Sequence, residues 1–153
     1  LGKDMRESEE IEMQIRQISK ECLYRTTDFA LEEMILLYQS KTHSEKWSSI
    51  KKSSYIESLI ISYPLESFLL LENKNSYIII DGNERTKSII DFINGDLKLT
   101  VKKVNKLDGK SYNELMLSRQ RNFMRKSLRV IVLNEDTDSE TLYHIYHSLN
   151  DKL

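Results

Sequence analysis

The sequence has 153 residues, the length of one ordinary domain. Hydrophobic residues make up 39% of the chain and charged residues 31%, and the chain contains only 4 glycines and 1 proline. This scarcity of turn residues excludes collagen-like and low-complexity chains and argues against an all-β sandwich. The formal net charge of −1 excludes a uniformly basic nucleic-acid binder. A single cysteine, Cys22, forms no internal disulfide and favours a reducing, cytoplasmic location. The longest apolar block, 59–71, is interrupted by polar residues, so we expect no membrane contact.

The first predicted element is a helix over residues 5–23. Its apolar residues recur at steps of four, three and four and form one narrow stripe. They are Ile11, Ile15, Ile18 and Cys22. We expect this stripe to pack onto the domain. A short coiled-coil seam is the alternative, because the spacing also suits the a and d positions of a heptad.

Two further helices are predicted before the first strand. One begins at Asp28, as its N-cap, and ends near Gln39. The other covers residues 54–63, and Pro64 ends it. Between them, residues 40–53 are polar and rich in serine and lysine, which is typical of a surface loop.

A change of period then predicts a β-hairpin followed by a helix. Residues 68–71 and 77–80 are apolar, and the intervening 73–76 contains asparagines, which adopt positive φ in turns. The second strand ends in Asp-Gly, and apolar spacing predicts a helix over 83–94. Gly95 follows as its C-terminal stop.

The last third of the chain alternates between strands and helices. We expect a half-buried strand over 97–102 with a basic solvent face, and a helix over 111–123 that a capping box opens. A buried strand follows at 128–133, and a second capping box at 137–140 opens the last helix. Because strict βαβ alternation is absent, the predicted fold is α+β, with a small mixed β-sheet packed with helices and preceded by N-terminal helices.

One segment, Ile-Asp-Gly-Asn-Glu-Arg-Thr at 80–86, combines a strand end, a glycine turn and a helix start. Unpaired N–H groups at a helix start favour a phosphate, and Arg85 can form a bidentate contact with one. The carboxylates of Asp81 and Glu84 could hold Mg²⁺ against that phosphate. The segment therefore predicts a nucleotide-phosphate corner. The alternative is structural: Asp81 caps the helix, and Arg85 pairs with Glu84 or a neighbour.

The sequence resembles, over residues 28–150, the ParB/sulfiredoxin-like family that forms the N-terminal domain of GmrSD-type restriction systems. That family has the signature I-D-G-Q-Q-R, and Asp-Gly-Asn-Glu-Arg at 81–85 stands in its place. Further similarities occur in the family's order: its opening helix at 29–38, its Trp at Trp47, L-I-E-S-I-L-x-G-x-P-I at 55–65, L-N-G-K-x-F-x-D-L at 107–115 and F-x-x-L-N at 146–150.

The resemblance implies a ParB-like domain over 28–153 behind a helical extension over 1–27. It implies nucleotide binding, with Mg²⁺-dependent hydrolysis of a nucleoside triphosphate, in a DNA-related defence system. DNA and a nuclease domain or subunit are the further expected partners, since the family normally continues beyond this point. The expected site residues are Asp81, Glu84 and Arg85 for catalysis, Asp81 and Glu84 for the metal, and Gly82, Asn83, Thr86 and Asn150 for the nucleotide.

Two segments depart from the family's pattern. The usual P-x-F-Q-R is replaced by 42–47, which has neither the Gln nor the Arg, and F-E-R-L-N has become Tyr-His-Ser-Leu-Asn at 146–150. The alternative function is therefore a DNA- or partner-binding module whose nucleotide corner has decayed and does not catalyse.

A basic stretch covers residues 98–129, with ten Lys and Arg against two acidic residues, a net charge of +8 in a chain of net −1. This asymmetry predicts a phosphate-binding face, with Tyr112 and Phe123 as stacking partners for bases. The alternative is a solvated face that acidic helices at 1–12 and 135–151 neutralise. The candidate nucleic-acid-binding residues are Lys98, Lys102, Lys103, Lys106, Arg121 and Arg125.

Overall fold

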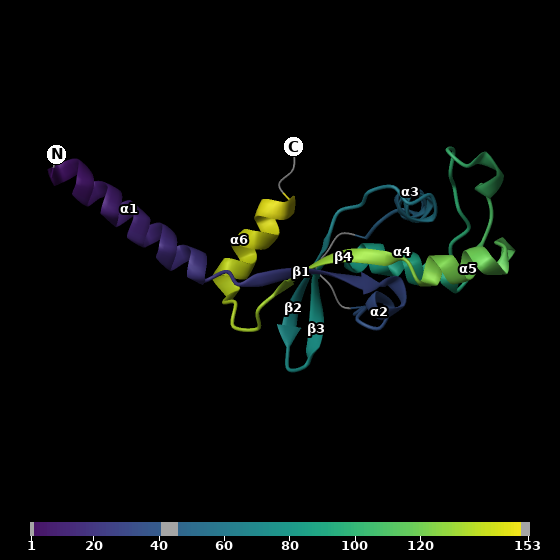
Figure 1. The fold of residues 1–153 in the computed structure, drawn as a ribbon. Helices are drawn as coiled ribbons and strands as arrows, with labels where there is room; N and C mark the ends of the chain where they lie inside the picture. Colours follow the sequence, from purple (N-terminus) through teal and green to yellow (C-terminus); the bar gives the residue numbers. More distant parts are fainter. Residues whose placement is uncertain (1, 41–45, 151–153) are drawn as a thin grey trace.

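The computed structural model describes residues 2–40 and 46–150 (Figure 1). Its elements in chain order are α1 (Gly2–Lys20), β1 (Tyr24–Ala30), α2 (Leu31–Ile35), α3 (Ser49–Ile60), β2 (Phe68–Asn73), β3 (Ser76–Asp81), α4 (Asn83–Ile93), the 3-10 helices η1 (Asn105–Leu107) and η2 (Tyr112–Glu114), α5 (Leu117–Met124), β4 (Ser127–Leu133) and α6 (Ser139–Asn150). The predicted α+β class is confirmed.

The four strands form one mixed sheet in the order β1-β4-β2-β3. β1 pairs antiparallel with β4, β4 parallel with β2, and β2 antiparallel with β3. The two central strands are apolar in consecutive positions, as expected for strands that are covered on both faces. The predicted hairpin is confirmed, and Lys74 and Asn75 take positive φ in its turn.

Helices supply the rest of the core. In Figure 1, α2, α3, α4 and α5 gather at one end of the sheet, whereas α1 extends away from the other end. Rings from α4 and α5 meet edge to face, with the centroids of Phe92 and Phe123 5.6 Å apart. Both rings are fully buried. Aromatic packing therefore anchors the C-terminal end of α4 in the core.

The predicted start of the second helix, at Asp28, is too early. Asp28 lies within β1, where it pairs with Arg129 of β4, and α2 begins only at Leu31. Pairing with β4 satisfies the backbone groups of residues 24–30 that face that strand, so the sheet overrides the local N-cap signal. The expected boundary between the helical extension and the domain, at 27–28, falls inside this strand.

The predicted strand over 97–102 is wrong, although its alternation is correct. Leu97, Leu99 and Val101 are buried, but the segment joins no strand of the sheet among the described residues. Leu99 instead exchanges backbone hydrogen bonds with the returning chain, accepting from Gly109 N at 2.7 Å and donating to Lys110 O at 2.9 Å.

Three helix boundaries also differ from the prediction. The predicted helix over 111–123 divides into η2 and α5, although Ser111 and Glu114 form the expected capping box. α3 begins at Ser49, inside the predicted loop over 40–53, because the Ser48 hydroxyl caps it by accepting from Lys51 N. Residues 41–45 of that loop lie outside the described residues. α6 is capped by Asp138, which accepts from Thr141 N, rather than by Thr137.

The apolar stripe of α1 does not pack onto the domain, contrary to our expectation. Ile11, Ile15 and Ile18 are 52%, 53% and 59% exposed. Figure 1 shows why: α1 projects from the sheet, and no other labelled element lies along it. No helix within 2–40 and 46–150 combines the length and the apolar character that crossing a membrane requires.

Candidate functional site

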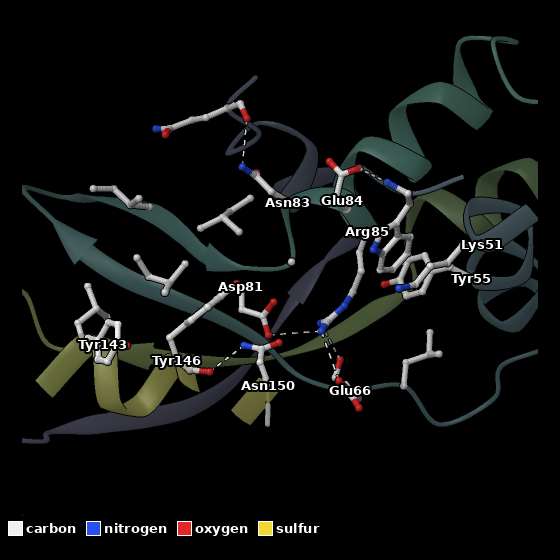
Figure 2. Close-up of a pocket in the computed structure, with 18 of the residues that line it drawn as sticks. Lys51, Tyr55, Glu66, Asp81, Asn83, Glu84, Arg85, Tyr143, Tyr146 and Asn150 are labelled. Carbon is white, nitrogen blue, oxygen red and sulfur yellow. Dashed lines mark hydrogen bonds and ion pairs between the residues drawn. The ribbon is translucent and has the colours of Figure 1, made fainter. Parts of the chain in front are cut away.

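A cavity of about 1050 Å³ lies where β3 meets α4. Its wall comes from the end of β3, the first turn of α4, α3, the segment before β2, and α6. The lining residues are Gln39, Trp47, Lys51, Tyr55, Leu65, Glu66, residues 78–85, Ser139, Leu142, Tyr143, Tyr146 and Asn150. Figure 2 shows these side chains around the corner that the sequence singles out.

Gly82 makes the turn from β3 into α4 possible. Its φ is +128°, a conformation that side chains rarely adopt, and a Cβ atom there would collide with the ring of Phe68. The first backbone bond of α4 runs from Thr86 N to Gly82 O. The amide groups of residues 83–85 therefore precede the helical ladder, and the positive end of the helix dipole lies at the cavity.

Arg85 lies buried in the first turn of α4, with its guanidinium at the cavity wall. Nη1 donates to Ser67 O at 3.0 Å, and Nη2 lies 3.6 Å from Asp81 Oδ2 and 3.5 Å from Glu66 Oε2. The guanidinium also lies over the Phe68 ring, 5.1 Å from its centroid. The structure thus brings Asp81 and Arg85 to one corner, in the kind of ion pair with a neighbour that the structural alternative expects, and these contacts hold the arginine in place.

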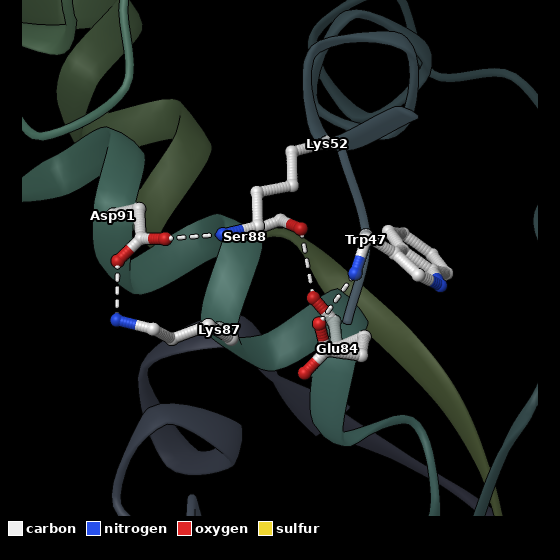
Figure 3. Close-up of polar contacts among 6 residues, drawn as sticks. All are labelled: Trp47, Lys52, Glu84, Lys87, Ser88 and Asp91. Atoms are coloured by element: carbon white, nitrogen blue, oxygen red, sulfur yellow. Dashed lines mark hydrogen bonds and ion pairs between the residues drawn. The ribbon is translucent and has the colours of Figure 1, made fainter. Parts of the chain in front are cut away.

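Glu84 faces away from that pair. Its Oε1 accepts from Trp47 N at 2.8 Å (Figure 3), whereas the carboxylate of Asp81 is turned toward Arg85 (Figure 2). The two expected metal ligands therefore do not converge on one point. Within 2–40 and 46–150, no group of three or more His, Cys, Asp or Glu is arranged to hold a metal ion. Asp81 is the carboxylate that could hold Mg²⁺ together with phosphate oxygens.

A partly buried ion-pair cluster links α4 to α3 beside the site. Asp91 accepts from Lys52 Nζ at 2.8 Å and from Lys87 Nζ at 2.7 Å (Figure 3). Burial acts to raise the pKa of Asp91, but the two lysine hydrogen bonds outweigh it and hold that pKa below its ordinary value. The cluster fixes α3, and with it the cavity wall, against α4.

The remaining expected nucleotide contacts divide into two groups. Asn150, on α6, lines the cavity beside Asp81 and Arg85, and its Nδ2 donates to Tyr146 O at 2.8 Å. Thr86 is fully buried, donates its hydroxyl to Gly82 O at 2.9 Å and is not part of the cavity wall. The tertiary fold therefore adds Asn150 to the corner and assigns Thr86 a structural contact.

Aromatic and basic residues of α3 and the segment before it were not among the expected site residues. The rings of Trp47 and Tyr55 meet edge to face with centroids 5.9 Å apart, and Lys51 Nζ lies 4.7 Å from the Trp47 ring centroid. The Ser48 cap was the sequence signal that could have revealed them. A helix that begins after Ser48 places Lys51 and Tyr55 one turn apart on one face.

The basic stretch lies away from this cavity. Figure 1 shows α5 and the 98–115 segment at the end of the molecule opposite α1. The acidic N-terminal helix therefore does not cover it. The prediction that Tyr112 and Phe123 stack on bases is wrong, because both rings are buried in the core. Lys103 lies 4.0 Å from the buried carboxylate of Glu57 and over the ring of Tyr63.

The other candidate nucleic-acid-binding residues are all exposed: Lys98, Lys102, Lys106, Arg121 and Arg125. Arg121 and Arg125 line a shallow depression on α5 together with Lys126. These five cations are therefore accessible from solvent.

The chain matches the family model of the N-terminal domain of the GmrSD restriction endonuclease over residues 44–153. It therefore belongs to this family, whose description places it in restriction systems. Neither a curated protein nor a solved structure gives a match.

Proposed function

We propose that this domain binds a nucleoside triphosphate in the cavity at residues 81–85, as the nucleotide-responsive part of a restriction-type defence system. The observation that carries the proposal is the meeting of the Arg85 guanidinium with the N-terminus of α4 in the wall of a cavity of about 1050 Å³. Small-molecule sites commonly occupy cavities of roughly 300–1,000 Å³. The space is sufficient for a nucleotide.

The phosphate end of the ligand would lie at the α4 corner. Helix N-termini bind phosphate through their unpaired N–H groups and dipole, and an arginine adds a charge-assisted hydrogen bond. Asp81 fits a magnesium ion that takes one carboxylate and completes its shell with phosphate oxygens and water. When bound, Mg²⁺ would neutralise phosphate charge. Asp81 would orient it, and Arg85 would hold the phosphate.

The aromatic wall suits the base. Every nucleobase has a π-face that stacks on aromatic side chains, and Tyr143 and Tyr146 of α6 both line the cavity. Hydrolysis is the further activity that the resemblance implies. Because the Glu84 carboxylate accepts from Trp47 N, we assign Asp81, rather than Glu84, to any metal-dependent step.

A thermal-shift panel of the four ribonucleoside triphosphates, with and without Mg²⁺, tests the proposal. A nucleotide at a hundred times its dissociation constant should stabilise the domain by about 2.7 kcal/mol. Asp81→Asn should remove the part of the shift that depends on Mg²⁺, whereas Asp96→Asn, on the exposed segment after α4, should not. Phosphate release in the same samples reports hydrolysis. A melting temperature indifferent to all four nucleotides would refute nucleotide binding.

A second candidate function is DNA binding by the exposed cations of the basic stretch. Among the described residues, none of Lys98, Lys102, Lys106, Arg121 and Arg125 forms an ion pair. Cations that are not neutralised within the protein remain available to phosphates, and each phosphate contact contributes about −0.9 to the slope of log affinity against log salt on duplex DNA.

A salt titration of DNA binding by fluorescence anisotropy tests this candidate. The double variant Arg121→Gln, Arg125→Gln should flatten the slope by about two units if both residues contact phosphate. Lys74→Gln, in the β2–β3 turn, is the matched control and should leave the slope unchanged. A slope that the arginine changes do not alter would assign the stretch to a solvated face.

A further inference from the structure

Two polar atoms in the cavity wall are buried without a hydrogen-bond partner among the described residues. They are the hydroxyl oxygen of Tyr55 and the side-chain oxygen of Asn83. Tyr55 is 8% and Asn83 7% exposed, and both residues line the cavity. Native proteins rarely leave buried polar atoms unpaired, because each one loses its hydration without compensation. A ligand that supplies the missing hydrogen-bond partners would compensate for this lost hydration.

The orientation of Asn83 determines what its oxygen can accept. Nδ2 donates to Gln39 O at 3.1 Å, and a carbonyl oxygen can only accept, so this contact fixes which end of the amide is the donor. Oδ1 is therefore the unpaired acceptor. It cannot bond an ionised phosphate oxygen, which carries no proton. It requires an N–H or O–H group, and in a nucleotide these belong to the sugar and the base.

The Tyr55 hydroxyl, in contrast to Asn83 Oδ1, can donate a hydrogen bond. Its side chain enters the cavity from α3 on the side of Arg85 (Figure 2). Burial raises the pKa of Tyr55 far above its ordinary value, with the charge of Arg85 acting in the lowering direction. The hydroxyl is therefore protonated at neutral pH and can donate. A phosphate oxygen drawn to Arg85 is an acceptor within the same part of the cavity.

We infer that the cavity binds its nucleotide in one orientation, with the Tyr55 hydroxyl donating to a phosphate oxygen held by Arg85 and with Asn83 Oδ1 accepting from a sugar hydroxyl or a base N–H. This inference rests on the proposed nucleotide-binding function and adds two polar contacts to it. Neither contact is supplied by the dipole of α4, so both add to the phosphate binding that the helix end provides.

The Tyr55→Phe variant tests the phosphate contact, with inorganic tripolyphosphate and a nucleoside triphosphate as probes in calorimetry. Hydrogen bonds to charged groups contribute enough that the variant should bind both probes at least about tenfold more weakly. The melting temperature of the ligand-free variant should be unchanged or higher, because no intramolecular hydrogen bond is lost. Tyr112→Phe is the matched control: its buried hydroxyl donates to Gln120 O at 2.9 Å. That control should lower the melting temperature and leave both affinities unchanged.

The Asn83→Ala variant tests the other end of the ligand. It should weaken binding of the nucleoside triphosphate by about tenfold and leave binding of tripolyphosphate unchanged. Since the variant also loses the hydrogen bond to Gln39, its stability should fall. Both affinities are measured on the same folded variant, so the comparison of the two probes remains valid.

The outcomes separate the two proposals. If the unaltered domain binds no nucleoside triphosphate, the proposed function fails and this inference fails with it. If the unaltered domain binds the nucleotide, and Tyr55→Phe binds both probes as tightly as the unaltered domain does, the proposed function stands and the Tyr55 contact is refuted. If Tyr55→Phe loses affinity for the nucleotide only, the orientation is wrong, because Tyr55 then faces the sugar or the base.

Discussion

The ring of Phe68 packs directly against Gly82, in the space that a Cβ atom on Gly82 would occupy. Phe68 is the first residue of β2 and is almost fully buried, and the guanidinium of Arg85 lies over the same ring. One phenyl ring therefore sets both the glycine turn and the position of the arginine. The cavity corner is built on the hydrophobic core rather than on an independent loop.

Gly82→Ala should destabilise the domain strongly. Strain at a positive φ and overlap with Phe68 together should reduce the free energy of unfolding by about 2–5 kcal/mol. Gly109→Ala is the control, since Gly109 has φ +77° but no atom within 4 Å of its Cβ position. It should lose only about 1–2 kcal/mol. Urea denaturation measures both, and equal losses would show that the Phe68 contact contributes nothing.

Arg85→Ala should destabilise the ligand-free domain as well as weaken nucleotide binding. The side chain is buried against Asp81 and two backbone carbonyls. Removing it takes a charged donor away from those groups, at a cost of about 2–4 kcal/mol in the free energy of unfolding. Arg129→Ala, which loses only an exposed pair with Asp28, should change stability by less than about 1 kcal/mol. A calorimetric melting temperature for Arg85→Ala equal to that of the unaltered domain would contradict this packing.

Asp91 should make the domain sensitive to acid. Its pKa in the folded state lies below the ordinary 3.8, because the lysine hydrogen bonds outweigh burial, so its stabilising effect is present above that pH and is lost as the pH falls further. Asp91→Asn should therefore flatten the dependence of stability on pH below about pH 4.

Asp91→Asn should also change the dependence of stability on pH at alkaline pH. The hydrogen bond to Asp91 raises the pKa of Lys87 above 10.5, so the contribution of Lys87 is complete below that pH and is lost as the pH rises through the raised value. Urea titrations across the pH range measure both effects. Curves of Asp91→Asn and the unaltered domain that remain parallel at both extremes would exclude this role for the cluster.

The exposed stripe of α1 should contribute almost nothing to the stability of the isolated domain. The double change Ile11→Ser, Ile15→Ser should alter the free energy of unfolding by no more than about 0.5 kcal/mol, as is usual for surface positions. Ile56→Ala, on the fully buried face of α3, should cost about 2–5 kcal/mol. A larger loss for the α1 variant that grew with protein concentration would indicate that copies of α1 associate.

Local chemistry was enough to predict several parts of this molecule. The β2–β3 turn follows from asparagines that tolerate positive φ, and the end of α4 follows from its apolar spacing and Gly95. The alternation over 97–102 correctly predicts which residues are buried. In each case the deciding interactions are made within a few residues, so the sequence contains them directly.

The candidate site was predictable only in part, for the same reason. Residues 81–85 form a continuous strand–glycine–helix turn, and this turn is where the cavity lies. The direction of the Glu84 side chain depends instead on the Trp47 amide, and the Tyr55 wall depends on where α3 begins. Neither partner is near in sequence, so no local pattern predicts them.

By itself, then, the sequence determined the periodic faces, the turns and the strand–glycine–helix corner at 81–85, since these depend on short-range backbone preferences and side-chain spacing. Tertiary structure decided the rest. Pairing with β4 made residues 24–30 a strand, packing on Phe68 buried Arg85, and the return of α6 brought Asn150 to the cavity. These outcomes depend on which distant groups satisfy a backbone amide, a charge or an apolar face, and that is settled only when the whole chain folds.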